Sequence, residues 1–219
     1  MRGSRTIPTE KIKPSSQVEE VLFRQGDTAD IISVILHADE KAPEFTRDFA
    51  PYFQSSSIRE TLEKIWDFVK KEIRYIKDPQ GHERIKSPGK TWADRSGDCK
   101  SMSVFIGSLL CNLGIPFVYR FAYYPNPMRP HDKDVNHVYP VAIVNGREYI
   151  LDAVVDRFNY EEPAEYVIDY DAPCLKKKGI GNTTTTTSVQ PGIFLIGGAA
   201  VLGLLLGSTL LCSSKSEPE

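Results

Sequence analysis

Three residues of this chain have side chains and an order that suit covalent catalysis: Cys99, His137 and Asp152, separated by 38 and 15 residues. A cysteine thiolate is a nucleophile, and a histidine can take the thiol proton and later give it to a leaving amine. A carboxylate can accept a hydrogen bond from the far ring nitrogen and fix the histidine tautomer. The three residues therefore form a hypothesis of acyl transfer through a thioester.

Two other interpretations of the same residues stay open. Cys99 can be a small core residue at the start of a helix, with His137 in the core and Asp152 in a turn. The three side chains are also zinc ligands, but no paired-ligand spacing accompanies them. We therefore expect neither a metal ion nor a cofactor.

The residues around Cys99 predict a buried helix with the cysteine in its first turn. Gly97 and Asp98 are typical of a turn that starts a helix, an apolar run continues to Leu113, and Gly114 is typical of a helix stop. Free N–H groups and the helix dipole at such an N-terminus lower the pKa of a thiol. The same N–H groups can hold an oxyanion.

His137 and Asp152 fall in two strand-like segments joined by Asn145-Gly146, which is typical of a type I′ hairpin turn. If Asn145 and Gly146 form a two-residue loop, the register of the two strands places His137 and Asp152 diagonally on one face of the hairpin. Diagonal neighbours lie about 7–8 Å apart at the backbone, which these two side chains can bridge. Pro140 inside the first strand predicts an edge position or a bulge there.

Further elements must support this helix and hairpin. A capping box that starts at Ser57, followed by apolar residues every three or four positions, predicts a helix to residue 73, with Trp66 in the core. Residues 31–36 favour a strand, with a helix as the alternative. Residues 117–124 favour a strand. Residues 82–96 are polar and are expected to form a connection.

The composition excludes some classes of function. The chain has 27 Lys and Arg against 29 Asp and Glu, which gives a net charge of −2 and no basic field for nucleic acid. Its four cysteines form no C-x-x-C pair, and 219 residues bury a core without a disulfide framework. We therefore expect a reduced compartment. No signal peptide is expected at the polar N-terminus.

The chain divides by composition into one domain with appended segments. The acidic stretch after Asp156 is expected to be a solvated surface segment that closes the domain. The expected divisions are a flexible arm at 1–17, a domain at 18–175, a Lys/Thr-rich linker at 176–191, a transmembrane helix at 192–212 and a short polar tail at 213–219.

The transmembrane prediction depends on 20 uncharged residues, 193–212, which span about 30 Å as a helix and so match a bilayer core. Gly203 and Gly207 form a G-x-x-x-G pattern, which favours self-association of such a helix. Three lysines, at 176–178, precede the span and only Lys215 follows it. The positive-inside rule then predicts a tail-anchored protein with a cytoplasmic domain and the lipid bilayer as a partner.

Several short motifs in one order resemble the transglutaminase-like superfamily, a branch of the papain-like thiol enzymes, over residues 58–155. The matching pieces are Ile73-Arg74-Tyr75-Ile76, Ser87-Pro88, Gly97-Asp98-Cys99, Leu113-Gly114-Ile115-Pro116, Asn136-His137-Val138-Tyr139, and Asn145-Gly146 through Leu151-Asp152. The resemblance implies an α+β domain in which the cysteine helix packs on an antiparallel sheet. It also implies a catalytic triad at Cys99, His137 and Asp152.

The expected function is a membrane-anchored enzyme that acts on protein or peptide amides. Hydrolysis would make it a peptidase or amidase and transfer to an amine would make it a cross-linking enzyme; both share one acyl-enzyme. Small members of the superfamily are often peptidases, so the resemblance favours hydrolysis. Trp92 is one option for a second oxyanion donor. The alternative is a non-catalytic interaction or structural module held at a membrane, for example in a membrane-containing particle.

Overall fold

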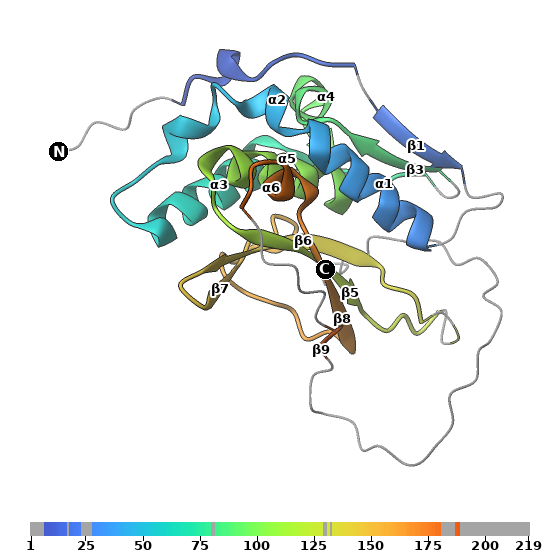
Figure 1. Cartoon of the computed structure of the whole chain (residues 1–219). Coiled ribbons are helices and arrows are strands. Elements are labelled where there is room, and N and C mark those ends of the chain that lie inside the picture. Colours follow the sequence, from blue (N-terminus) through green and yellow to red (C-terminus); the bar gives the residue numbers. More distant parts are fainter. Residues whose placement is uncertain are drawn as a thin grey trace.

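The computed structural model describes residues 7–16, 18–22, 28–79, 82–128, 131, 133–180 and 187–188, with the backbone alone for 18–22 and 187–188. Its main sheet is antiparallel, with the strand order β7-β6-β5-β8-β9. The strands are β5 (Phe117–Tyr123), β6 (His137–Val144), β7 (Arg147–Ile150), β8 (Tyr166–Asp171) and β9 (Thr187–Ser188). Figure 1 shows the helices gathered on one side of this sheet, so the predicted α+β class is confirmed.

Two small ladders lie among the helices. Strands β1 (Val18–Leu22) and β3 (His82–Lys86) pair antiparallel. Strands β2 (Arg74–Tyr75) and β4 (Ser96–Gly97) pair parallel, so Tyr75 lies opposite Gly97. The second ladder ties the end of one helix to the residues that lead into Cys99.

The helices surround a central one, α5 (Cys99–Leu113), which lies against β5 and β6 in Figure 1. Around it lie α1 (Thr28–Lys41), α2 (Pro43–Thr46), α3 (Ile58–Glu72), α4 (Pro88–Asp94), α6 (Pro173–Lys177) and the 3₁₀ turns η1 (Thr9–Lys11) and η2 (Ala50–Phe53). Residues 99–111 of α5 are all buried. The predicted nucleophile helix is therefore the core element of the domain.

Local sequence signals explain the ends of α5 and α3. The Asp98 carboxylate accepts a hydrogen bond from the Ser101 N–H at 3.0 Å, which satisfies a free donor of the first turn of α5. Gly114 ends that helix in the left-handed conformation, at φ 67°. Ser57 Oγ accepts from the Glu60 N–H at 3.2 Å and caps α3. Both predicted helices are confirmed.

A glycine allows α5 to lie close to the sheet. A Cβ at Gly107 would collide with the hydroxyl of Tyr119 on β5. That hydroxyl donates a hydrogen bond to Asp39 Oδ1 of α1 at 2.7 Å, and both residues are fully buried. Sheet, central helix and α1 are thus joined at one point in the core.

Two sequence expectations about the N-terminal half are wrong. Residues 31–36 belong to helix α1, not to a strand, because the buried isoleucines at 31, 32 and 35 follow the helical repeat. The expected polar connection at 82–96 instead forms β3, α4 and β4. Ser87 Oγ caps α4 by accepting the Lys90 N–H at 3.2 Å, and Pro88 occupies the first turn.

Pro140 lies on an interior strand, which corrects the expected edge position, and the register of β6 with β5 and β7 is continuous without a bulge. The Leu151 N–H donates to the Pro140 carbonyl at 3.0 Å, so the polar backbone of Pro140 faces β7. Strand β7 ends at Ile150, one residue before this contact. The missing N–H of proline therefore falls where the ladder ends and interrupts little of it.

The acidic segment after Asp156 is more than a solvated surface, because it supplies β8 and part of an ion cluster. The buried guanidinium of Arg120 binds Asp169 at 2.8 Å, Glu161 at 2.9 Å and Glu148 at 3.1 Å. The cluster lies on the face of the sheet away from α5. Sequence pattern alone did not reveal these carboxylates as partners of one arginine.

The segments outside the predicted domain differ in how far the structure describes them. Within the expected flexible arm, Ile12 is buried and the Lys13 N–H donates to the Phe45 carbonyl at 2.8 Å. Helix α6 extends to Lys177, past the expected domain end at 175. No helix among the described residues is long and apolar enough to cross a membrane. The predicted transmembrane helix, 192–212, and the tail, 213–219, lie outside the described residues.

Candidate active site

His137 and Asp152 form a buried pair at one end of the sheet. His137 Nε2 lies 2.7 Å from Asp152 Oδ2, and the two residues are 4% and 5% exposed. The predicted hairpin supports this contact: Asn145 and Gly146 both have positive φ, and Val144 pairs with the first residue after the turn. The diagonal approach expected from the register is confirmed.

Asp152 is held from several sides. Its Oδ1 accepts the Val154 N–H at 2.9 Å, and its carbonyl accepts the Trp66 indole N–H at 2.7 Å. Lys70 Nζ, one turn further along α3, donates to the Val154 carbonyl at 3.0 Å. The sequence predicts only a core position for Trp66, yet its indole N–H also holds the backbone at Asp152. The signal available in the sequence was that a buried indole N–H needs an acceptor.

His137 has one ring nitrogen left for chemistry. Nε2 faces Asp152, whereas the buried Nδ1 has no hydrogen-bond partner among the residues that the structure describes. The imidazole packs near two aromatic rings, with its centre 5.9 Å from that of Tyr124 and 5.4 Å from that of Tyr139. The ring is therefore fixed, and Nδ1 is the atom that can exchange a proton with a thiol.

Cys99 is the first residue of α5 and is 1% exposed. Ser103, one helical turn later, donates from Oγ to the Val138 carbonyl at 2.9 Å. Val138 is the residue after His137. This hydrogen bond ties the cysteine end of the helix to the histidine end of β6, as the predicted triad requires.

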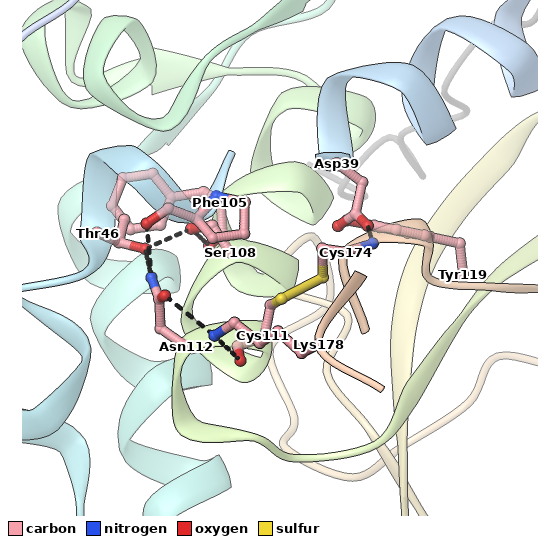
Figure 2. Close-up of a disulfide and its surroundings, with 10 residues drawn as sticks. Asp39, Thr46, Phe105, Ser108, Cys111, Asn112, Tyr119, Cys174 and Lys178 are labelled. Atoms are coloured by element: carbon pink, nitrogen blue, oxygen red, sulfur yellow. Dashed lines mark hydrogen bonds between the residues drawn. A yellow bond between two sulfur atoms is a disulfide. The ribbon is translucent and has the colours of Figure 1, made fainter. Parts of the chain in front are cut away.

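None of the cysteines within the described ranges is a free thiol. Cys111 on α5 forms a disulfide with Cys174 on α6, with the Cα atoms 6.3 Å apart, and Cys99 is disulfide-bonded as well. The structure therefore contains a disulfide that the sequence does not predict, because the packing of α6 brings together cysteines 63 positions apart. The expected reduced compartment stays a prediction. Figure 2 shows the Cys111–Cys174 bond between the two helices.

Two aromatic residues, Tyr75 and Trp92, differ in their surroundings and in whether they can donate a hydrogen bond at the site. Tyr75 pairs with Gly97 at the start of the cysteine turn, and burial, together with Asp152, raises the pKa of its phenol. The hydroxyl therefore stays protonated and able to donate. Trp92, our option for an oxyanion donor, stacks on Phe68 at 5.6 Å and under the guanidinium of Arg95 at 3.2 Å. These contacts describe a packing residue, and its oxyanion role stays a prediction.

A mixed helix-and-sheet domain with a cysteine at a helix start and a buried His–Asp pair on the sheet defines a thiol enzyme. Residues 47–153 match the family model described as the transglutaminase-like superfamily. This part of the chain belongs to that superfamily. Among curated proteins the chain has no match.

Three solved structures are similar to this chain. A candidate cysteine protease from Cytophaga hutchinsonii is 18% identical, with a TM-score of 0.40, over 66% of this chain and 46% of that one. Calcium-bound LapG from Legionella pneumophila is 17% identical, with a TM-score of 0.43, over 67% and 85%. A candidate protease from Parabacteroides distasonis is 14% identical, with a TM-score of 0.47, over 71% and 30%. These similarities are too distant to indicate a substrate.

Proposed function

We propose that this protein is a membrane-anchored cysteine hydrolase that cleaves amide bonds of proteins or peptides through a Cys99 thioester. The observation that supports it best is the state of His137: buried, held through Nε2 by Asp152, and with Nδ1 without a hydrogen bond among the described residues. A buried ring nitrogen without a partner is costly unless a reacting group uses it. The family match of residues 47–153 supports the same assignment.

The proposed reaction has two halves. His137 Nδ1 takes the proton of the reduced Cys99 thiol, and the thiolate attacks the carbonyl carbon of the amide. The carbon–nitrogen bond breaks, the imidazolium gives its proton to the leaving amine, and a thioester remains. Water, deprotonated by His137, then attacks the thioester and releases a carboxylic acid with the thiol. The N–H groups of the first turn of α5 stabilise the oxyanion in both halves.

Transfer to an amine is the competing outcome at the same acyl-enzyme. Incubating the reduced protein with a mixture of protein substrates and a primary-amine probe, followed by mass spectrometry, separates the two. New carboxyl termini or deamidated glutamines support hydrolysis, whereas probe attached to glutamine side chains supports transfer. A Cys99→Ala variant that gives the same products as the parent protein would overturn both.

One observation favours a second candidate function, a non-catalytic module held at a membrane. Cys99 is disulfide-bonded, and a sulfur in a disulfide is no nucleophile. The two candidates differ in their response to reductant: the enzyme gains turnover and thiol labelling at Cys99, whereas the module gains neither. This comparison is the first experiment we would perform.

The side of the membrane on which the domain lies has two opposing indications. The lysines at 176–178 favour the cytoplasmic side. The Cys111–Cys174 disulfide is typical of an oxidising compartment. Protease added outside intact cells decides between them, because only an external domain is digested.

A further inference from the structure

The first turn of α5 carries a buried group of charges that the proposed chemistry does not use. The ammonium of Lys100, a residue 2% exposed, lies 2.5 Å from Glu83 Oε2 and 3.5 Å from Asp78 Oδ2, and it also forms an ion pair with Asp98 Oδ2. Glu83 lies on β3, and Asp98 and Lys100 flank Cys99 in the sequence. The group therefore joins β3 to the turn that holds the nucleophile.

Lys100 faces three carboxylates in this group, and one of them, Asp78, also pairs through Oδ1 with Arg84 Nε at 3.3 Å. Glu83 and Asp98 are each 2% exposed, and removing a charge from water costs several kcal/mol per ion unless it is paired. Burial raises the pKa of Glu83 even with Lys100 beside it. Glu83 Oε2 has this ion pair and, within the described part of the chain, no hydrogen bond. The carboxylates therefore need a cation to stay together.

The group also fixes the geometry of the cysteine turn. Asp98 Oδ1 accepts the Ser101 N–H at 3.0 Å, while Asp98 Oδ2 binds Lys100, so both oxygens of the helix cap are engaged. Ser101 Oγ accepts the Lys86 N–H of β3 at 3.2 Å. Successive side chains lie about 100° apart around a helix, so Lys100 anchors the turn from a different face than Cys99.

We propose that Lys100 is a built-in cation and a positioning residue for Cys99. Its ammonium holds Asp78, Glu83 and Asp98 where three carboxylate ligand atoms, all within 4.8 Å of one another, would otherwise suit a divalent metal ion. The inference depends on the proposed thiol function, because the role assigned to Lys100 is to orient that thiol. It implies that neither the fold nor the reactivity of Cys99 depends on added divalent cations.

The test compares the full chain in detergent with a Lys100→Met variant, which keeps the bulk of the side chain and removes its charge. Two quantities are measured after mild reduction, with EDTA and with CaCl2 at about 5 mM, which exceeds the Kd of weak carboxylate sites: the Tm, and the rate of Cys99 alkylation by iodoacetamide, followed by mass spectrometry. The parent protein should be insensitive to both additions. Lys100→Met should label about 10- to 100-fold more slowly, as expected for a displaced reacting group, and CaCl2 should restore part of the rate.

Two further variants separate positioning from capping and from net charge. Asp98→Asn keeps a good helix cap but loses the ion pair, so its labelling should also slow. Lys100→Met combined with Glu83→Gln removes one charge of each sign, and we expect it to fold and still to label slowly. If Lys100→Met alone does not fold, this double variant takes its place.

Several outcomes would overturn the proposal. A parent protein that loses Tm in EDTA or gains it in CaCl2 binds a metal ion that Lys100 does not replace. A folded Lys100→Met or double variant that labels at the parental rate shows that Lys100 does not position Cys99, and a slow variant that CaCl2 leaves slow shows that Lys100 is no stand-in for a divalent ion. If the proposed thiol function is wrong, Cys99 of the parent protein is alkylated no faster than in the denatured chain. The Tm comparison then still tests whether Lys100 takes the place of a cation.

Discussion

At the scale of single residues, the roles proposed for Cys99, His137 and Asp152 predict how much rate each substitution should cost. Cys99→Ala removes the nucleophile and His137→Ala removes the base, so each should reduce turnover to background. Asp152→Asn keeps the Val154 contact through its oxygen but can favour the wrong imidazole tautomer. Because a thiol is more acidic than a hydroxyl, we expect a smaller loss than in serine enzymes, of about 10²-fold. Steady-state kinetics under reducing conditions measures all three.

All three residues are buried, so their variants need a check on folding. Cys99, His137 and Asp152 are at most 5% exposed, so a substitution at any of them can also change the stability of the fold. Circular dichroism and Tm should accompany each rate. Equal losses of rate with an intact fold in Cys99→Ala and His137→Ala support Cys99 as nucleophile and His137 as base. Full activity in either variant contradicts these roles.

Asp39 should make the stability of the domain depend on pH. Burial raises the pKa of this carboxyl from its ordinary value of 3.8 to about 6. The folded protein therefore binds a proton that the unfolded chain releases, and the stabilisation is full below pH 3.8 and is lost as the pH rises through about 6. The lost free energy of unfolding is about 3 kcal/mol.

Asp39→Asn should remove that dependence. Urea unfolding at several pH values between 4 and 7 measures this. As the pH rises, the free energy of unfolding should decline less for the variant than for the parent protein. Asp48→Asn, which changes an exposed carboxylate in the same region, is the matched control and should keep the parental slope. If the free energy of unfolding of Asp39→Asn and of the parent protein changed with pH in parallel, Asp39 would be excluded as the origin of the pH dependence.

At the scale of elements, α3 should affect the site through a single hydrogen bond. Trp66→Phe keeps most of the ring in the core but leaves the Asp152 carbonyl without its donor. We expect a loss of about 1 kcal/mol in the free energy of unfolding, together with a lower kcat, because the Asp152 turn loosens. Leu62→Val on the same helix loses packing alone and serves as control. A parental kcat in Trp66→Phe would show that the indole only packs.

The disulfide between α5 and α6 should contribute more to the free energy of unfolding than the Trp66 hydrogen bond does. Replacing both Cys111 and Cys174 by serine opens a loop of 63 residues, for which the chain-entropy estimate is about 4 kcal/mol of stability. Urea unfolding of the double variant, compared with the oxidised parent protein, measures the difference. A change below about 1 kcal/mol would mean that the disulfide is absent or unimportant in solution.

The elements show which parts of this fold the sequence reveals. Helices α3 and α5 could be predicted because their caps and their apolar residues agree, and the hairpin of β6 and β7 because Asn145-Gly146 sets its register. The sequence favours a strand within helix α1 because its short isoleucine-rich run has β-branched residues and fits either period. The β-ladder between residues 18–22 and 82–86 depends on long-range pairing, which leaves little local pattern.

The same reasoning explains which site residues were found. Cys99, His137 and Asp152 were named because their side chains carry chemistry whatever surrounds them. The supporting residues Trp66, Ser103 and Lys100 act only through their partners, and most of those partners lie far away in sequence: Asp152 for Trp66, Val138 for Ser103, and Glu83 and Asp78 for Lys100. A lysine in the first turn of a helix expected to be buried was a usable sign, because a buried charge requires acidic neighbours.

At the scale of the whole molecule, the predicted anchor should decide where the protein lies. The full chain should partition with membranes, whereas residues 1–178 should stay in the aqueous phase. Leu204→Arg with Leu206→Arg keeps the full length but should release the protein, because each arginine near the centre of a span opposes insertion by about 2.5–3.5 kcal/mol. A full chain that stays aqueous without detergent would contradict the anchor. Self-association through Gly203 and Gly207 is tested by cross-linking the same samples.

The bond between α5 and α6 also determines where a mechanical load would enter the domain. Tension applied beyond the described C-terminal residues would first detach β9, which pairs over only two residues. It would then reach α6 and pass through the Cys111–Cys174 bond into α5. Cys99 lies at the far end of that helix, about 20 Å away. A stretched tether would therefore pull on the nucleophile helix through the disulfide, and also on β8, which precedes α6 in the chain and pairs with β5.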